Sequence, residues 1–157
     1  MDKIIEYDDP YTRKHLSNNE YLYDCSKHVD FVSYLKDNIP FEGDKFIRQS
    51  IKSKISSYKS QDKKSKKYDE SQFITYEQLI GKLNDCNLVC YYCGITTLLV
   101  YKSKKETKQW SLERLNNNLG HYDSNTCISC LKCNLERRNS NYEYFKFSKT
   151  LCVQKLE

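Results

Sequence analysis

The chain of 157 residues lacks any long hydrophobic run. No stretch is long and apolar enough to cross a membrane, and the N-terminal sequence MDKIIEYDDP has no apolar segment of signal-peptide length. We therefore expect no membrane contact and an intracellular, reducing compartment, the cytoplasm or the nucleus. Hydrophobic residues are also few, 38% of the chain, and many are tyrosines. So thin a core favours a small fold that is stabilised by additional links such as metal ligands.

Acidic residues are scarce in one part of the chain. The net charge is only +5, but residues 45–67 contain nine Lys or Arg residues and a single acid, Asp62. Ile47, Ile51, Ile55 and Tyr58 recur at helical spacing, which predicts a basic amphipathic helix followed by a solvated loop over 61–72. A charge run is usually just a solvated face. Here we expect it to bind phosphates without reading sequence, because lysines neutralise the nucleic-acid backbone. The candidate nucleic-acid contacts are Lys52, Lys54, Lys59, Lys63, Lys64, Lys66 and Lys67, with Arg137 and Arg138 further on.

The remaining patterns predict an α+β protein without internal repeats. Helices are expected over 20–37 and 75–83, the second opened by a Thr75/Gln78 capping box. Short β segments are expected over 94–101 and 109–115, then a strand at 126–128 and a helix that starts at Asn134. We divide the chain into an N-terminal arm and helix (1–44), a basic helical segment (45–85), a cysteine-containing domain (86–145) and a tail (146–157).

The eight cysteines include two pairs at metal-ligand spacing. Cys90 and Cys93 form one pair, and a glycine follows them. The second pair is Cys127/Cys130 or Cys130/Cys133, and we choose Cys130/Cys133 because Cys127 falls on the predicted strand. In a reducing compartment, four such cysteines indicate a structural Zn²⁺ rather than disulfides. The other cysteines, Cys25, Cys86 and Cys152, have no partner at this spacing and are expected to fill the core.

The order of these residues resembles the HNH endonucleases. The motif elements are Cys90-x-x-Cys93-Gly94, then Leu112-Glu113-Arg114, then a loop with Gly120 and Asn125, and finally Cys130-x-x-Cys133-Asn134. This is similar to the zinc-stapled branch with a ββα-metal, treble-clef-like fold, which includes phage recombination endonucleases. The resemblance covers roughly residues 45–140. The Asn-, Lys- and Tyr-rich composition suggests an AT-rich genome such as that of a large DNA virus, so the compartment would belong to an infected host.

The resemblance implies roles for three residues. Glu113 matches the carboxylate that binds a catalytic divalent metal, Mg²⁺ or Mn²⁺. Asn125 matches the asparagine that ties the loop to the strand, and Asn134 matches the second metal ligand. Without the resemblance, Glu113 would be read as an exposed strand carboxylate and Asn134 as a helix N-cap.

The histidine that serves as general base in this family is missing. Arg114 stands at its position, and a guanidinium does not accept a proton, although it can clamp a phosphate. His121 is the nearest histidine in sequence and is chemically suited to be the base. Two alternatives stay open: His121 is a polar loop residue, or a metal-bound hydroxide acts without a protein base.

The sequence thus predicts a small ββα-metal domain with a zinc knuckle, preceded by a basic helical part. The expected function is metal-dependent endonuclease activity of low sequence specificity, with double-stranded DNA favoured over RNA. The alternative is a non-catalytic zinc-containing protein that binds nucleic acid or serves in a virion or scaffold. Arg114 is the residue that favours this alternative.

Overall fold

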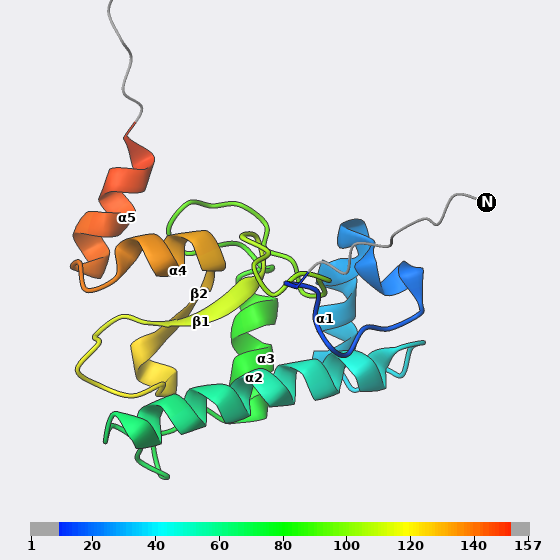
Figure 1. Cartoon of the computed structure of the whole chain (residues 1–157), viewed down its shortest axis with the longest axis horizontal. Coiled ribbons are helices and arrows are strands. Elements are labelled where there is room, and N and C mark those ends of the chain that lie inside the picture. The colour runs from blue at the N-terminus through cyan, green and yellow to red at the C-terminus, as the bar shows by residue number, and fades with distance from the viewer. Residues whose placement is uncertain (1–9, 152–157) are drawn as a thin grey trace, which may run out of the picture.

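The computed structural model describes residues 10–151 and shows a mixed α+β fold (Figure 1). Cys152, expected to fill the core, lies outside the described residues. In order along the chain, the elements are the 3-10 helices η1 (Glu20–Tyr23) and η2 (Cys25–Lys27), the helices α1 (His28–Lys36), α2 (Asp44–Lys64) and α3 (Tyr76–Asp85), the strand β1 (Trp110–Arg114), the 3-10 helix η3 (Asp123–Asn125), the strand β2 (Thr126–Cys130), and the helices α4 (Leu131–Arg137) and α5 (Tyr142–Thr150).

The long helix α2 runs along one side of the molecule (Figure 1). Its predicted apolar stripe is confirmed, since Ile47 and Ile51 are buried and Tyr58 packs against the same core. The helix continues to Lys64, so the expected loop over 61–72 is wrong for its first residues. The physical reason is Asp62, which is fully buried (0% exposed) and bonded to a distant loop rather than solvated.

The predicted helix over 20–37 is also only partly correct. The chain forms two 3-10 turns before α1 begins at His28. The Asn19 side chain accepts a hydrogen bond from the backbone N–H of Tyr21, and Asp24 accepts one from Ser26. Short polar side chains that bond the nearby backbone compete with a continuous helix, which explains the division.

Helix α3 agrees with the sequence prediction. Its capping box is present, with Gln78 N–H donating to Thr75 Oγ1 and Thr75 N–H donating to Gln78 Oε1. Leu79 and Leu83 are fully buried. The helix packs against α1, α2 and β2, so it holds the helical part against the hairpin.

Strands β1 and β2 form an antiparallel hairpin in which Glu113 lies opposite Cys127 and Leu112 opposite Ile128. Leu112 and Ile128 enter the main core. Strand side chains alternate between faces, so Glu113 lies on the other face, where it contacts α4. The expected β segment over 94–101 does not form a strand. It makes isolated bridges, such as Val89 with Thr96 and Leu98 with Gln109.

Helix α4 starts inside the second cysteine pair rather than at Asn134. Cys130 is its N-cap, and its Sγ accepts a hydrogen bond from the Cys133 N–H (3.4 Å). Asn134 therefore lies within the helix and is not its cap, which corrects that alternative. The expected irregular tail is replaced in part by α5, which runs across the proposed boundary at 145/146.

One hydrophobic core joins the segments on either side of the boundaries at 44/45 and 85/86. It includes Leu22, Ile51, Leu83 and Ile128, which come from the N-terminal turns, α2, α3 and the hairpin. These segments therefore fold as one unit. A second, small cluster surrounds the cysteines and packs against α5 through Tyr142 and Phe145. Among residues 10–151, no helix is both long and apolar enough to cross a membrane.

Candidate functional site

Four cysteine thiols converge at one point of the fold. The Sγ atoms of Cys90, Cys93, Cys130 and Cys133 all lie within 4.8 Å of one another. The Cys93 and Cys130 sulfurs are 3.9 Å apart, close to the separation of about 3.8 Å that tetrahedral Zn–S bonds of about 2.3 Å require. The donor set fits a structural Zn²⁺, and it confirms the choice of Cys130/Cys133. Gly94 follows the first pair with a φ of 75°, a conformation that favours glycine.

Cys127 is not part of this cluster. It lies on β2, partly buried, and packs against the cluster from outside. Burial raises the pKa of Cys127 to about 12, so the side chain is a neutral thiol at neutral pH. Its role is that of a small apolar residue beneath the hairpin, as the sequence predicted.

A groove of about 510 Å³ lies between α2, β1 and α4. Four of the five residues expected to be catalytic line it; the fifth, Asn125, supports its wall from the adjoining loop. The lining residues used below are Lys54, Tyr58, Ser111, Glu113, Arg114, His121, Asn134 and Arg138. The fold therefore brings the candidate residues of the hairpin and the basic helix to one surface.

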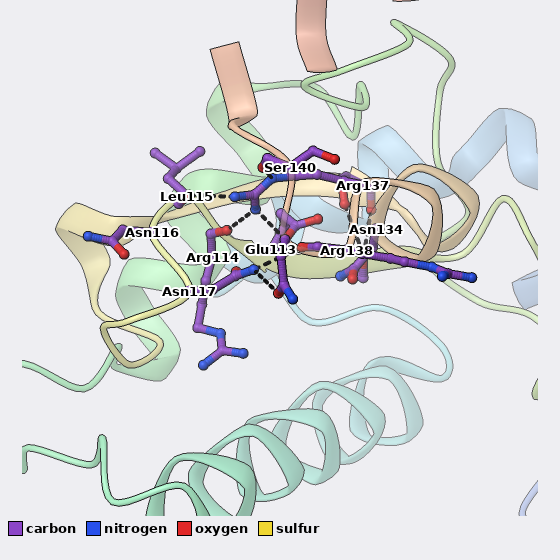
Figure 2. Close-up of polar contacts among 12 residues, drawn as sticks. Glu113, Arg114, Leu115, Asn116, Asn117, Asn134, Arg137, Arg138 and Ser140 are labelled. Carbon is purple, nitrogen blue, oxygen red and sulfur yellow. Dashed lines mark hydrogen bonds and ion pairs between the residues drawn. The ribbon is translucent and has the colours of Figure 1, made fainter. Parts of the chain in front are cut away.

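Glu113 is buried (5% exposed) on the α4 face of the hairpin. Its Oε1 accepts a hydrogen bond from Arg137 Nη1 at 2.9 Å (Figure 2). Its Oε2 is also buried, yet it has no hydrogen-bond partner within the described part of the chain. Burial raises the pKa of Glu113 to about 7, while Arg137 acts in the opposite direction. One carboxylate oxygen is thus held in place and the other is free.

Arg137 was expected to contact nucleic acid, and the structure corrects this. The residue is 2% exposed, and its guanidinium is enclosed by acceptors. Besides Glu113 it donates to the carbonyl oxygens of Arg114, Leu115 (2.6 Å) and Ser140 (2.9 Å) (Figure 2). Because its guanidinium is engaged inside the fold, Arg137 cannot serve as a surface phosphate contact. Arg138, by contrast, is exposed and lines the groove.

Asn134 lies on α4 and faces β1. Its Nδ2 donates to Ser111 Oγ at 3.2 Å, and Ser111 Oγ in turn lies 3.0 Å from the carbonyl oxygen of Ser129. These contacts orient the amide, and no described residue donates to its Oδ1. Asn134 Oδ1 and Glu113 Oε2 are therefore two oxygen acceptors without a donor among the described residues, and both residues line the groove.

Arg114 is the last residue of β1 and directly follows Glu113. The side chain is half-buried, and its Nη1 makes a long hydrogen bond to the carbonyl oxygen of Leu119 (3.4 Å). In Figure 2 the side chain extends away from Arg137. Because this end of the strand is followed by a loop, Glu113 and Arg114 line the same groove.

His121 is buried (4% exposed) against α2. Its Nδ1 is 2.7 Å from Asp62 Oδ1, and its backbone N–H donates to Asp62 Oδ2 at 2.6 Å. The imidazole stacks on the Tyr58 ring with centroids 4.7 Å apart. Burial lowers the pKa of His121, and Asp62 acts in the opposite direction. His121 is thus a neutral imidazole near neutral pH.

Asn125 holds the loop between the strands. Its Oδ1 accepts from the Asn116 N–H, and its Nδ2 donates to the carbonyl oxygens of Asn116 and Gly120, each at 3.0 Å. The amide fixes the loop that carries His121 to the end of β1. None of these hydrogen bonds joins Asn125 to another candidate catalytic residue. The role of Asn125 is therefore to shape the loop.

The expected basic track divides into groups. Lys54 is not on an exposed face: its ammonium donates to the Trp110 carbonyl oxygen and lies 4.1 Å from the Trp110 ring centroid. Burial lowers the pKa of Lys54 well below its usual range. Lys67 donates to the carbonyl oxygen of Asn117 at 2.6 Å. The others remain at the surface: Lys52 beside the Tyr76 ring, Lys59 and Lys63 beside the Tyr68 ring, and Lys64 and Lys66 in solvent.

Sequence reasoning missed the contributions of Asp62, Tyr58 and Ser111 to this site. Asp62 left one signal, because it is the single acid among nine basic residues. Comparisons of the chain with protein-family models, curated proteins and solved structures gave no match.

Proposed function

We propose that the chain is a metal-dependent endonuclease of the HNH type, which hydrolyses phosphodiester bonds in DNA with low sequence specificity. The observation that carries the proposal is the buried Oε2 of Glu113, which has no hydrogen-bond partner among the described residues. Glu113 lines the same groove as Asn134, beside the cysteine cluster. A buried carboxylate oxygen without a partner is costly, and a bound cation removes that cost.

The residues of the groove fit a hard divalent cation. A carboxylate oxygen and an amide oxygen are ligands that Mg²⁺ accepts while it keeps several waters. Glu113 and Asn134 would hold the ion, which would supply Lewis-acid stabilisation of charge on the phosphate. Arg137 orients Glu113 through Oε1 and leaves Oε2 available.

Arg114 and the basic helix serve substrate binding in this proposal. The guanidinium of Arg114 clamps a phosphate oxygen and stabilises the charge that develops as the bond breaks. Lys52, Lys59, Lys63, Lys64 and Lys66 supply affinity for the backbone without base contacts. Contacts to the phosphate backbone alone would give weak sequence preference, with duplex DNA bound along α2.

The decisive experiment is nicking of supercoiled plasmid with Mg²⁺ or Mn²⁺. Glu113→Gln should abolish nicking, because the amide cannot replace the carboxylate as a metal ligand. Its zinc content should stay at one ion per chain. Glu143→Gln, an exposed glutamate on α5, is the matched control and should cleave like the wild type.

The second candidate function is nucleic-acid binding without cleavage. Two observations favour it: Arg114 replaces the family's base, and the Glu113 carboxylate already has a cationic neighbour in Arg137. If the wild-type protein binds DNA but cleaves no DNA or RNA with any divalent ion, the endonuclease proposal is refuted and this one takes its place.

A further inference from the structure

We propose that His121, held by Asp62 of α2, is the general base of the groove, so that the basic helix completes the active site. The inference rests on the proposed function. Asp62 is a positioning residue here, and His121 is the residue that faces the substrate water.

The contacts of Asp62 fix the state of the imidazole. A carboxylate accepts hydrogen bonds, so the Nδ1 of His121 at 2.7 Å from Oδ1 carries the proton. The second oxygen accepts from the His121 backbone N–H. Both oxygens therefore bind one residue, and Nε2 is left with its lone pair. No described residue bonds Nε2, and His121 lines the groove.

The chain around His121 is shaped for this contact. A Cβ at Gly120 would lie 2.7 Å from Asp62 Oδ2 and 2.6 Å from the Lys67 carbonyl oxygen, so glycine is required for the close approach. The Tyr58 ring covers one face of the imidazole. These contacts hold the imidazole against α2 in one orientation, and a base that is already oriented is more effective.

The charges around His121 come from each side of the groove. Asp62 and Tyr58 contact it from α2, and the Arg114 guanidinium acts on it from the end of β1. Lys54 and Arg138 line the same groove. Asp62 raises the pKa of the imidazole, whereas burial and Arg114 lower it. The neutral form, which a general base needs, is favoured near neutral pH.

The proposed step balances as a hydrolysis. A water molecule gives a proton to Nε2 of His121, and its oxygen forms the new bond to phosphorus. The P–O bond to the leaving sugar oxygen breaks, and that oxygen takes a proton from a second water. The proton on His121 then neutralises the hydroxide left behind. Asp62 stabilises the positive charge on the ring while it is protonated.

The alternative is that the Asp62–His121 contact only ties the loop to α2. That role requires a hydrogen bond but no free Nε2, and it predicts no effect on the pH dependence of the rate. The pH profile of single-turnover nicking therefore separates the two roles. The profile is measured with a Mg²⁺-supplemented, zinc-loaded protein.

The main test uses His121→Ala with its matched control His15→Ala, an exposed histidine outside the groove. His121→Ala should cleave about 100- to 10,000-fold more slowly, lose the acid inflection of the rate, and regain part of its activity when imidazole is added. His15→Ala should match the wild type. Wild-type rates in a folded, zinc-loaded His121→Ala protein would overturn the proposal, and so would a slow variant that imidazole does not rescue.

Two further variants shift the inflection in opposite directions. Asp62→Asn removes the charge that raises the His121 pKa, so the inflection should move to lower pH. Arg114→Ala removes a charge that lowers it, so the inflection should move to higher pH while the rate falls. Arg114 lowers the pKa of Glu113 as well, so the direction seen in Asp62→Asn is the one that identifies the imidazole. If Asp62→Asn does not fold, rescue of His121→Ala by imidazole decides. If the variants cleave DNA but the inflection of the rate against pH does not move, the proposed role of the Asp62–His121 pair is overturned and the proposed function stands. If the wild-type protein does not cleave, the proposed function itself is refuted.

Discussion

At the scale of single residues, His28 shows how completely this small protein fixes a buried polar group. The side chain is 0% exposed. Its Nδ1 accepts a hydrogen bond from the Leu99 N–H (3.1 Å), and its Nε2 donates to the Leu22 carbonyl oxygen (2.9 Å). Both nitrogens are used in the neutral form. A proton on Nδ1 would face the Leu99 N–H, so protonation is incompatible with this arrangement.

This arrangement predicts a loss of stability in acid. Burial lowers the pKa of His28 in the folded state. The unfolded chain then binds more protons, so the contribution of His28 is fully present above its unfolded pKa of about 6.5 and is lost as the pH falls below it. His28→Gln should cost about 1–3 kcal/mol at pH 7.5, and the difference from wild type should shrink at pH 5.5.

The measurement is urea unfolding of both proteins at the two pH values. Release of zinc in acid should lower the free energy of unfolding of the wild type and of His28→Gln equally. It therefore cancels in the difference between the two proteins. His15→Gln, which changes an exposed histidine, should match the wild type throughout. A difference between His28→Gln and wild type that is the same at both pH values would contradict the prediction.

At the scale of elements, α2 combines two tasks on one helix. Its apolar stripe and Asp62 face the protein, and its outer lysines face solvent. Lys63 and Lys64 at the C-terminal end of α2, and Lys66 just beyond it, follow the residues of α2 that line the groove. This end of the helix is therefore expected to direct nucleic acid into the groove.

Replacing Lys63, Lys64 and Lys66 together by Gln should weaken DNA binding equally for all sequences. The slope of log affinity against log salt should become flatter by about 0.9 for each phosphate that is no longer neutralised. Lys67 is left intact because it supports the loop through Asn117. Fluorescence anisotropy with two unrelated duplexes over a salt series measures both quantities.

The matched control replaces Lys14, Lys36 and Lys45 by Gln, which removes the same charge from surfaces away from that end of α2. It should lower affinity much less. An equal decrease in affinity for the two triple variants would show that net charge, and not the position of the lysines at this end of α2, determines binding.

The elements also show why sequence reasoning succeeded for some features and not for others. The cysteine ligands, the Thr75 capping box and the stripe on α2 follow from spacings of a few residues, which local geometry determines. The Asp62–His121 contact joins residues 59 apart in sequence, and no local pattern encodes that distance. Arg137 was misassigned for the same reason, since an arginine is placed at the surface by default and only the fold shows its carboxylate.

At the scale of the whole molecule, the two hydrophobic clusters should respond differently to removal of zinc. The main core is formed by aliphatic and aromatic side chains, whereas the second cluster consists mainly of the cysteines, with Tyr92 as its largest buried residue. A chelator should therefore unfold α4 and α5 first. In hydrogen exchange, amides of residues 131–150 should lose protection while those of α1 and α3 keep more of it.

Two cysteine variants make this prediction specific. Cys133→Ser should lose zinc and show the exchange pattern of the chelated protein. Cys127→Ser should keep one zinc per chain, because Cys127 lies outside the cluster. Full zinc content and an unchanged melting temperature in Cys133→Ser would contradict the assignment of the ligands.

Leu22 and Ile128 belong to one core, so that core can be completed only after the C-terminal half of the chain has been synthesised. On the ribosome, α1 to α3 emerge well before the hairpin that completes their core, and the chain lengthens by about 5–20 residues per second. His121 and Cys130 emerge with the hairpin, and Cys133 and Asn134 emerge after it. Under the proposed function, the nascent chain therefore carries the basic helix α2 before the groove is assembled. The order of synthesis delays cleavage until translation is nearly complete.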